Sequence, residues 1–370
     1  MSDSKTYPAI KMVISGGGTG GHLFPAIAIA QKVKLLSPQS EVLFVGAKGK
    51  MEMEKVPKYN FPIKGLWISG FNRQKMSRNI SLPFKVISSL WNAMGIVRRF
   101  KPDIAVGVGG YASGPLLWAA GRKGIPTMLQ EQNSFPGVTN KMLAPKARKI
   151  CVAFKGMDRF FPEEKLVLTG NPIRENIQEL SASEARKNLG FAQDKKTILL
   201  IGGSLGARTL NDAMVNGLDD LLQSNVQILW QTGKLYYEEI MDKVGSRLNG
   251  NIKPTAFIDN MDTAYAAADL VISRAGALSI SELTFLGKAS ILVPSPNVAE
   301  DHQTKNAMAL VETGAAKLVK DKDAKTELVP TALQLLEDEE QLLSLASKSK
   351  ALAMPDAATH IAHELFKLVG

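Results

Sequence analysis

One histidine ends a glycine-rich segment near the N-terminus and is the first candidate for acid–base chemistry. The segment reads Val13-Ile14-Ser15-Gly16-Gly17-Gly18-Thr19-Gly20-Gly21-His22, and the whole chain has four histidines. An apolar run precedes it and a helix-like run follows, so we expect His22 at the start of a helix. A helix N-terminus disfavours the charged imidazolium, and a general base must be neutral. His22 is therefore a candidate base, and a capping or packing histidine is the alternative.

The glycines of this segment match the pattern G-x-G-x-x-G at Gly16, Gly18 and Gly21. Such glycines let backbone N–H groups approach an anion in front of a helix N-terminus. A dinucleotide site also requires an acidic residue about 20 positions further on, at the end of the second strand. The sequence has Gly46-Ala47 there, so a dehydrogenase is disfavoured. A plain turn without a ligand would explain one or two glycines but not five.

A second candidate stretch is Ser273-Arg274-Ala275-Gly276-Ala277-Leu278-Ser279-Ile280-Ser281-Glu282. Gly276 makes a turn, and the N–H groups of the helix that begins near Ala277 suit a diphosphate. Glu282 lies about one and a half helical turns further on, at a position to accept hydrogen bonds from a ribose. The alternative role of Glu282 is an acid that complements the helix dipole.

Three further segments place polar or small residues where strands should end. Gly107–Pro115 is a third glycine-rich turn, and Gln130-Glu131-Gln132-Asn133 follows the next strand. A loop and the first turn of a helix hold Gln303, within Pro294–Ala307. Polar groups on loops at strand ends are typical of functional sites.

The elements that must position these residues are short apolar strands alternating with helices. Because the strands are continuously rather than alternately apolar, we expect parallel sheets buried on both faces, an α/β fold. The predicted helices include Ala26–Leu36, Leu116–Gly121, Ala207–Gln223, Glu300–Thr313 and Ala357–Leu368. The predicted strands are Met12–Ser15, Glu41–Val45, Ile104–Val108, Pro126–Gln130, Lys149–Ala153, Thr197–Ile201, Val226–Gln231, Thr255–Ile258, Leu270–Ser273 and Ser290–Val293.

The two series of strands look like two copies of one plan, each opening with a strand, a glycine-rich loop and a helix. The second loop is Gly202–Ala207, and a turn at Thr169–Pro172 marks the junction. We predict one domain over residues 1–170, a second over 171–354, and a helix within 355–370 that returns to the first. Because ligands of open α/β sheets bind beyond the carboxyl ends of the strands, function is expected in a cleft between the two.

Length and composition narrow the class of protein. A chain of 370 residues suits two domains, and its net charge of +10 favours anionic partners. The basic residues are scattered and no nucleic-acid-binding motif is present, so nucleic acid is not an expected partner. No apolar run reaches the about 18–20 residues of a membrane span, and the start lacks an apolar signal region, so we expect a cytoplasmic protein. The single cysteine, Cys151, is expected in a buried strand.

No metal or cofactor is expected. His360 and His363 are three residues apart on the predicted last helix, without a neighbouring cluster of carboxylates or cysteines.

A set of motifs in this order resembles the MurG family of glycosyltransferases over nearly the whole chain. The matching stretches are Gly17–Pro25, Gly109–Tyr111, Glu131–Asn133, Gly170–Arg174, Gly202–Arg208, Phe257–Asp259, Ser273–Ala277, Ser281-Glu282 and Asp301–Gln303. The resemblance implies two Rossmann-like doubly wound domains facing a cleft, the GT-B architecture. It implies transfer of N-acetylglucosamine from UDP-N-acetylglucosamine to the 4-hydroxyl of the muramyl sugar of lipid I, with inversion, which forms lipid II for peptidoglycan.

The resemblance also assigns roles to residues. Thr19, Gly20, Gly21 and Asn133 of the first domain would meet the donor sugar and diphosphate. Arg174, Ser204, Ile258 and Gln303 would join them, with the backbone of Ile258 presented to uracil. The helix start formed by Ala277, Leu278, Ser279, Ile280, Ser281 and Glu282 would hold the diphosphate and ribose.

The region around Trp67–Lys85 mixes apolar and basic residues, which suits an anionic membrane surface. The family places its lipid-linked acceptor on the first domain beside such a patch, so the resemblance implies a peripheral protein at the cytoplasmic face of the bacterial inner membrane. The neighbouring stripe of Ile87, Leu90, Trp91, Met94 and Val97 is interpreted as a core face.

Inversion needs one displacement at the anomeric carbon, with a base that takes the acceptor proton. Our hypothesis is that His22 is that base and that helix N-termini and loop amides stabilise the departing UDP. Three other readings stay open: a UDP-N-acetylglucosamine 2-epimerase with the same two-domain plan, a dehydrogenase, and a UDP-sugar-binding protein without catalysis.

Overall fold

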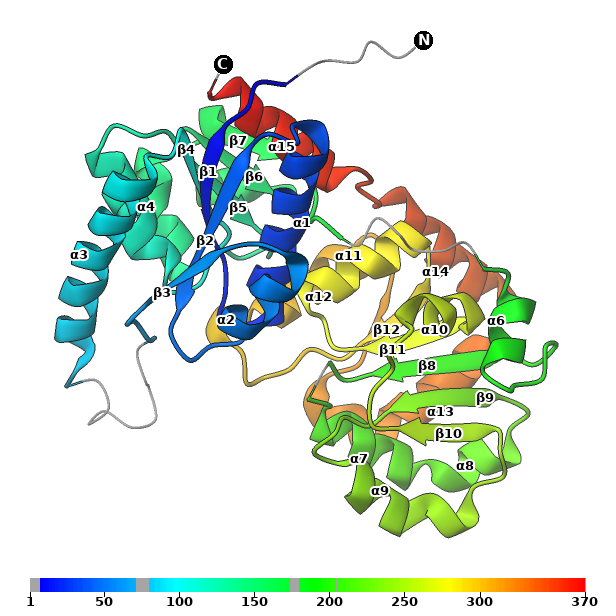
Figure 1. Ribbon diagram of the computed structural model, residues 1–370. Coiled ribbons are helices and arrows are strands. Elements are labelled where there is room, and N and C mark those ends of the chain that lie inside the picture. The colour runs from blue at the N-terminus through cyan, green and yellow to red at the C-terminus, as the bar shows by residue number, and fades with distance from the viewer. Residues whose placement is uncertain (1–6, 71–79, 174–179, 204, 370) are drawn as a thin grey trace. The chain divides into compact units, whose positions relative to one another are not determined.

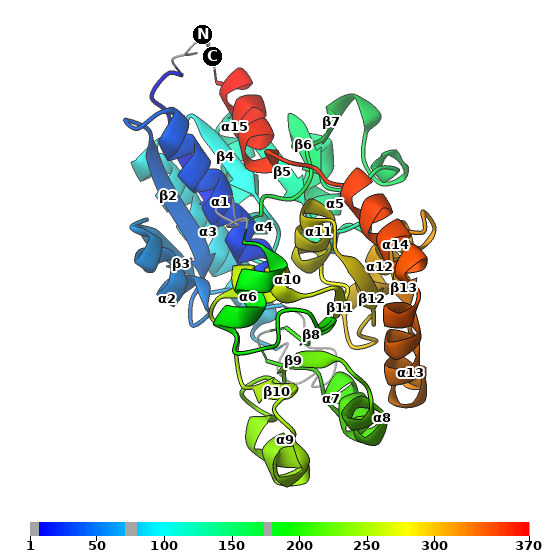
Figure 2. The ribbon, with the colours of Figure 1, turned by 90° about the vertical axis from the view of Figure 1, so that its right-hand side faces the viewer.

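The computed structural model describes residues 7–70, 80–173, 180–203 and 205–369 (Figure 1). The chain divides into two compact units: unit 1 holds Met1–Arg174 with Met354–Gly370, and unit 2 holds Glu175–Ala353. Each unit is a parallel sheet with helices packed on its faces (Figures 1 and 2). The predicted fold class, two doubly wound Rossmann-like α/β domains, is confirmed.

The sheet of unit 1 has the strand order β3-β2-β1-β4-β5-β6-β7, and every pairing is parallel. Its strands are β1 (Lys11–Ser15), β2 (Glu41–Ala47), β3 (Ile63–Leu66), β4 (Ile104–Gly107), β5 (Thr127–Glu131), β6 (Lys149–Val152) and β7 (Leu166–Leu168). The strand order reverses between β1 and β4. Ligands of doubly wound sheets bind at such a switch point, so the loops that follow β1 and β4 are the first place to look for a site.

The helices of unit 1 cover both faces of this sheet. They are α1 (Gly20–Leu36), α2 (Glu52–Lys55), α3 (Leu82–Phe100), α4 (Ser113–Arg122), α5 (Val138–Leu143) and α15 (Ala357–Lys367). Met12 and Ile14 of β1 face a core shared with α1 and α15, whereas Val13 faces a second core shared with α3 and α4. Ile361 and Leu365 of α15 are fully buried in the first core, so this late helix is part of unit 1.

Unit 2 repeats the plan with the strand order β10-β9-β8-β11-β12-β13, again wholly parallel. Its strands are β8 (Thr197–Ile201), β9 (Gln227–Gln231), β10 (Ile252–Thr255), β11 (Leu270–Ser273), β12 (Ala289–Leu292) and β13 (Lys317–Leu318). Its helices are α6 (Ala182–Asn188), α7 (Arg208–Asn216), α8 (Leu218–Gln223), α9 (Tyr237–Val244), α10 (Met261–Ala267), α11 (Ala277–Leu286), α12 (His302–Val311), α13 (Ala324–Glu337) and α14 (Glu339–Ala351). The switch point lies between β8 and β11.

Two of the predicted elements are displaced. The strand predicted at Thr255–Ile258 is wrong: β10 ends at Thr255, and Ile258 lies in the loop beyond it. This strand contains Pro254, which has no N–H to donate; an edge strand tolerates proline because a donor on its outer side has no partner strand to bind. Helix α1 extends further back than the helix-like run Ala26–Leu36: it begins at Gly20, two residues before His22, which was expected at the helix start.

The interpretation of the α3 stripe as a core face is wrong for two of its members. Ile87 is 65% exposed and Trp91 is 81% exposed, whereas the buried face of α3 consists of Ser89, Ala93 and Val97. Met94, Ile96 and Phe100 also pack against this core and are partly buried. Phe84, Ile87 and Trp91 are instead exposed.

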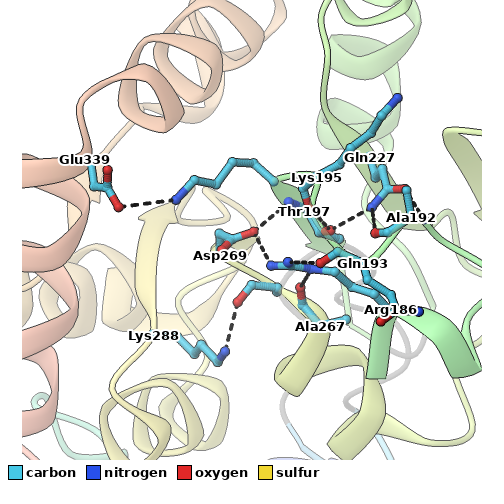
Figure 3. Close-up of polar contacts among 12 residues, drawn as sticks. Arg186, Ala192, Gln193, Lys195, Thr197, Gln227, Ala267, Asp269, Lys288 and Glu339 are labelled. Atoms are coloured by element: carbon cyan, nitrogen blue, oxygen red, sulfur yellow. Dashed lines mark hydrogen bonds and ion pairs between the residues drawn. The ribbon is translucent and has the colours of Figure 1, made fainter. Parts of the chain in front are cut away.

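A partly buried ion pair joins the amino ends of two strands of unit 2 to helix α6 (Figure 3). Arg186 donates to Asp269 Oδ2 at 2.7 Å and to the carbonyl oxygens of Ala267 and Gln193 at 3.1 and 2.9 Å. The same Asp269 oxygen accepts the N–H of Thr197, the first residue of β8. Burial lowers the pKa of the nearby Lys288 ammonium. These contacts lie at the amino ends of the strands, opposite to the carboxyl ends that carry the loops of the switch point.

Candidate active site

His22 lies at the switch point of unit 1, in the first turn of α1 and half-buried. Its ring rests against the loop that follows β4. At Gly109, where φ is +100°, a Cβ atom would lie 3.1 Å from His22 Nδ1 and 3.3 Å from Nε2. Only glycine combines this backbone conformation with the close approach of an imidazole ring. The third glycine-rich turn predicted from the sequence is thus the surface on which the candidate base sits.

A second contact holds the ring of His22. Its Nδ1 atom lies 2.8 Å from Oε1 of Gln132, a buried side chain just beyond β5. Gln132 belongs to the polar cluster noted in the sequence, but the sequence assigned it no role. Its partner is 110 positions away, and the spacing of residues does not reveal which of several polar side chains reaches the histidine.

Asn133 follows Gln132 and is held by a buried carboxylate. Oε1 of Glu131 accepts the backbone N–H and the side-chain Nδ2–H of Asn133, at 3.0 and 3.2 Å. The other oxygen of Glu131 accepts from Gly137 N and Asn140 Nδ2. The carboxylate therefore fixes the loop between β5 and α5. Thr19, Gly20, Gly21 and His22 are brought together with Asn133 through Gln132.

A buried acid also lies under the first glycine-rich loop, although β2 ends on Gly46-Ala47. Glu52 of α2 accepts the N–H of Gly18 at 3.0 Å and of Ala47 at 2.9 Å. A Cβ atom at Gly17 would lie 2.4 Å from its carboxyl carbon. Because Glu52 is 1% exposed and bound to backbone, it is not a ribose ligand of the dinucleotide type. The carboxylate of Glu52 itself binds the N–H of Gly18, where an anionic ligand of this loop would otherwise bind.

At the switch point of unit 2, two loops approach each other through glycine. A Cβ atom at Gly233 would lie 2.4 Å from the Cα atom of Gly206. Helix α11 begins after Gly276, just beyond the carboxyl end of β11. The first N–H groups of α11 have no acceptor within the helix. A diphosphate fits such a helix start.

The six predicted residues of α11 have different surroundings. Ile280 is 2% exposed and faces the core, and Ser281 Oγ donates to the carbonyl oxygen of Ala277 at 3.0 Å. Glu282 Oε2 accepts a hydrogen bond from the hydroxyl of Tyr265 at 2.9 Å. Since Tyr265 is itself buried, it orients the carboxylate. Sequence reasoning missed Tyr265, which lies on α10, one strand earlier in the chain.

Amide side chains connect Ile258 and Gln303 to loops of unit 2. The amide of Gln231 binds Ile258, and the amide of Gln303 binds Ser295. The N–H of Ile258 donates to Gln231 Oε1 at 3.2 Å, and Gln231 Nε2 donates to the carbonyl oxygen of Gly203 at 2.9 Å. Of the Ile258 backbone, the carbonyl rather than the N–H is left for a ligand. Gln303, in the first turn of α12, accepts the N–H of Ser295 at 2.8 Å.

The turn before α12 has an unusual backbone: Glu300 and Asp301 have φ of +57° and +50°. Such left-handed non-glycine residues gather at functional sites. Arg274, from the same motif as α11, donates to the carbonyl oxygens of Val293 and Pro294 and pairs with Asp321. Its charge is therefore used to hold the loop after β12.

Two predicted site residues, Arg174 and Ser204, lie outside the described residues. Within the described ranges, no three His, Cys, Asp or Glu side chains gather in a way that could hold a metal ion. Each of the other predicted residues lies in a loop or helix that follows the carboxyl end of a strand of its own unit.

An apolar surface extends along α3 of unit 1. Phe84, Ile87 and Trp91 are exposed on this helix, three or four positions apart, with Trp67 exposed nearby. Lys85 Nζ lies 5.8 Å from the centre of the Trp67 ring. We call these five residues the α3 surface. Among the described helices, none has the length and apolar character needed to cross a membrane.

Comparisons with family models match both halves of the chain. Residues 12–152 match the glycosyltransferase family 28 N-terminal domain, and residues 197–361 match the glycosyltransferase family 28 C-terminal domain. A relative from Parabacteroides distasonis is 52% identical over 361 residues, 97% of this chain and 98% of the relative. It is named UDP-N-acetylglucosamine--N-acetylmuramyl-(pentapeptide) pyrophosphoryl-undecaprenol N-acetylglucosamine transferase.

Solved structures of other proteins have a similar fold. The crystal structure of Acinetobacter baumannii MurG is 32% identical with a TM-score of 0.78, covering 97% of this chain and 100% of that one. The UDP-GlcNAc 2-epimerase from Neisseria meningitidis bound to UDP-GlcNAc is 15% identical with a TM-score of 0.65, covering 97% of this chain and 100% of that one. At that identity the likeness concerns the fold alone, so it does not support the epimerase reading.

Proposed function

The chain belongs to the MurG family, within glycosyltransferase family 28, and on this basis we propose that it forms lipid II for peptidoglycan synthesis. It transfers N-acetylglucosamine from UDP-N-acetylglucosamine to the 4-hydroxyl of the muramyl sugar of lipid I, with inversion. The observation that carries the proposal is the 52% identity, over almost the full length of both chains, to a relative named for this transfer.

In the proposed reaction, His22 takes the proton of the acceptor 4-hydroxyl. The oxygen forms a bond to the anomeric carbon while the bond from that carbon to the β-phosphate oxygen breaks, and UDP leaves with the electron pair. One displacement inverts the configuration. The place of His22, in the first turn of the helix at the switch point of unit 1 with its ring held on two sides, supports this role.

The donor binds unit 2 in this proposal. The N–H groups at the start of α11, from Ala277 to Ser279, receive the diphosphate, where negative charge develops as UDP leaves. Glu282, oriented by Tyr265, accepts from the ribose, and the Ile258 carbonyl accepts from uracil. Family membership adds Arg174, Ser204 and Gln303 to the donor site, and Thr19, Gly20, Gly21 and Asn133 toward the donor sugar.

Label transfer tests the function. The protein is incubated with radiolabelled UDP-N-acetylglucosamine, with and without a lipid I analogue. Transfer that depends on the analogue supports the proposal. Release of UDP without the analogue indicates an epimerase, and binding without turnover indicates a UDP-sugar-binding protein.

The base is tested with His22→Ala. Because a general base contributes about 10²- to 10⁴-fold to rate, kcat should fall by about that factor while the affinity for UDP-N-acetylglucosamine is unchanged. A near-normal kcat with unchanged donor binding would show that another group takes the proton.

The acceptor and the membrane concern unit 1. The α3 surface combines exposed aromatic residues with Lys85, as expected for a helix that lies at the interface of an anionic bilayer. In this proposal the protein is peripheral to the cytoplasmic face of the inner membrane, and unit 1 meets the lipid-linked acceptor there.

Vesicle sedimentation tests the α3 surface. Burial of a large apolar side chain contributes about 1.5–3 kcal/mol, so Trp91→Ser should weaken binding to vesicles containing phosphatidylglycerol about tenfold or more. Leu343→Ser removes a comparably exposed apolar side chain from α14 of unit 2 and is the control. Equal binding of wild type and Trp91→Ser would remove this surface from the proposal.

A further inference from the structure

We propose that Gln132 is a positioning residue that sets the tautomer of His22, with the proton on Nδ1 and the lone pair on Nε2. The inference rests on the proposed function for its role in catalysis, but the tautomer itself follows from a set of buried amides behind the histidine. Each amide has one oxygen that accepts and one nitrogen that donates, so the orientation of one fixes the orientation of the next.

The orientation starts from a backbone carbonyl, which can only accept. Asn171 Nδ2 lies 3.0 Å from the carbonyl oxygen of Gln132 and must therefore be the donor. Its Oδ1 is then the acceptor for Gln130 Nε2, at 3.0 Å. Consequently Gln130 Oε1 faces Gln132 and accepts from its Nε2.

A second backbone carbonyl indicates the same orientation of the Gln132 amide. Gln132 Nε2 lies 2.7 Å from the carbonyl oxygen of Val108, which an oxygen in that place would repel. The oxygen of the Gln132 amide therefore points at His22, 2.8 Å from Nδ1. An amide oxygen has no proton to give, so Nδ1 of the imidazole must carry the hydrogen.

The set of buried amides is suited to hold His22 in the Nδ1–H tautomer. Gln130, Gln132 and Asn171 are each at most 2% exposed, so water does not compete for their amides. Gly109 lies against the ring and limits its rotation. In the neutral imidazole, Nε2 is then the atom with a free lone pair, and it is the atom that takes the acceptor proton. Because the partner is an uncharged amide, it orients the ring without the charge that would favour the imidazolium.

The tautomer is measured directly by NMR. Long-range ¹H–¹⁵N correlation spectra of ¹⁵N-histidine-labelled protein distinguish a proton on Nδ1 from one on Nε2. The chain has four histidines, and His22 is assigned by the signals lost in His22→Gln. We expect Nδ1–H in the wild type at pH 8, and a loss of that preference in Gln132→Met. A wild-type His22 protonated on Nε2 overturns the proposal, whatever the activity of any variant.

Kinetics tests the consequence for the reaction. Gln132→Met removes the acceptor and should lower kcat about 10- to 100-fold, part of what a general base contributes, with KM for UDP-N-acetylglucosamine unchanged. Because the ring is then free to take the other tautomer, the fall in kcat should accompany the loss of the Nδ1–H preference seen by NMR. A Gln132→Met variant that loses this preference but keeps the wild-type kcat contradicts the coupling.

A matched control separates positioning from folding. Gln227 is an equally buried amide in β9 of unit 2, where it bonds to Ala192 and Thr197. Gln227→Met should lower the free energy of unfolding but leave both kcat and the tautomer of His22 unchanged. If His22→Ala keeps full activity, the proposed base is wrong, and the NMR result still decides whether Gln132 sets the tautomer.

Discussion

Substitution of Gly109 by alanine probes how closely the position of His22 is controlled. The added methyl carbon would lie 3.1 Å from Nδ1 and Cε1 of the ring, inside the about 3.5–4.0 Å of ordinary carbon contacts. The imidazole must then move by about half an ångström or more, or the loop must shift. Alanine at φ +100° adds about 1–3 kcal/mol of backbone strain.

The expected result follows from these two quantities. Displacement of a catalytic group by about 1 Å lowers the rate about 10²-fold, so we expect kcat of Gly109→Ala to fall about 10- to 100-fold. The KM for UDP-N-acetylglucosamine should stay unchanged, since Gly109 is not among the residues that meet the donor in the proposed function. The assay is label transfer to a lipid I analogue at saturating donor, together with urea unfolding.

Gly124 provides the control. It also has a positive φ, +74°, but nothing lies within 4 Å of the position of its Cβ atom. Gly124→Ala should therefore lower the free energy of unfolding by about 1–3 kcal/mol without changing kcat. If Gly109→Ala is folded and keeps the wild-type kcat, the close contact does not control the base and the reasoning fails.

Three further predictions concern other parts of the chain. Tyr265→Phe removes a hydrogen bond to the Glu282 carboxylate and should raise the KM for the donor about tenfold, with kcat little changed; steady-state kinetics measures both. Arg186→Met leaves the carboxylate of Asp269, 20% exposed, without its ion pair and should lower the free energy of unfolding by about 3 kcal/mol, the low end for a buried pair; urea titration measures it. Burial raises the pKa of Cys151 to about 12, so the native protein at pH 8.5 should resist alkylation by iodoacetamide. Because the thiol of the unfolded chain ionises near pH 9, the free energy of unfolding should fall as pH rises from about 9 toward 12, and it should fall less in Cys151→Ala.

The sheets and their switch-point loops could be predicted because strands buried on both faces are apolar throughout. Pro254 concealed an edge strand, since local preference there is overruled by position in the sheet. The start of α1 at Gly20 lies within two residues of His22, where the helix was expected to start. On α3, the periodicity of large apolar residues indicated a buried face. Periodicity shows that such residues share a side of a helix, but it does not show whether that side faces a core.

The candidate site was less accessible to sequence reasoning. His22 and Glu282 were singled out from their places at helix starts, but the residues that orient them were not. Gln132 and Tyr265 act across long separations in the chain, and a buried amide or hydroxyl looks ordinary until its partner is known. Glu52 is a similar case, because the acid under the first loop comes from a helix and not from the end of β2.

The place of α15 in unit 1 has a consequence for synthesis on the ribosome. Residues 357–367 emerge after the whole of unit 2, yet Ile361 and Leu365 fill the core beneath α1, the helix that begins beside His22. Unit 2 is continuous in the chain and can fold as soon as it has emerged, whereas unit 1 stays incomplete until α15 arrives. Unit 1 thus begins to be translated before unit 2 but is completed after it, and its histidine gains a settled scaffold only once unit 2 has been synthesised.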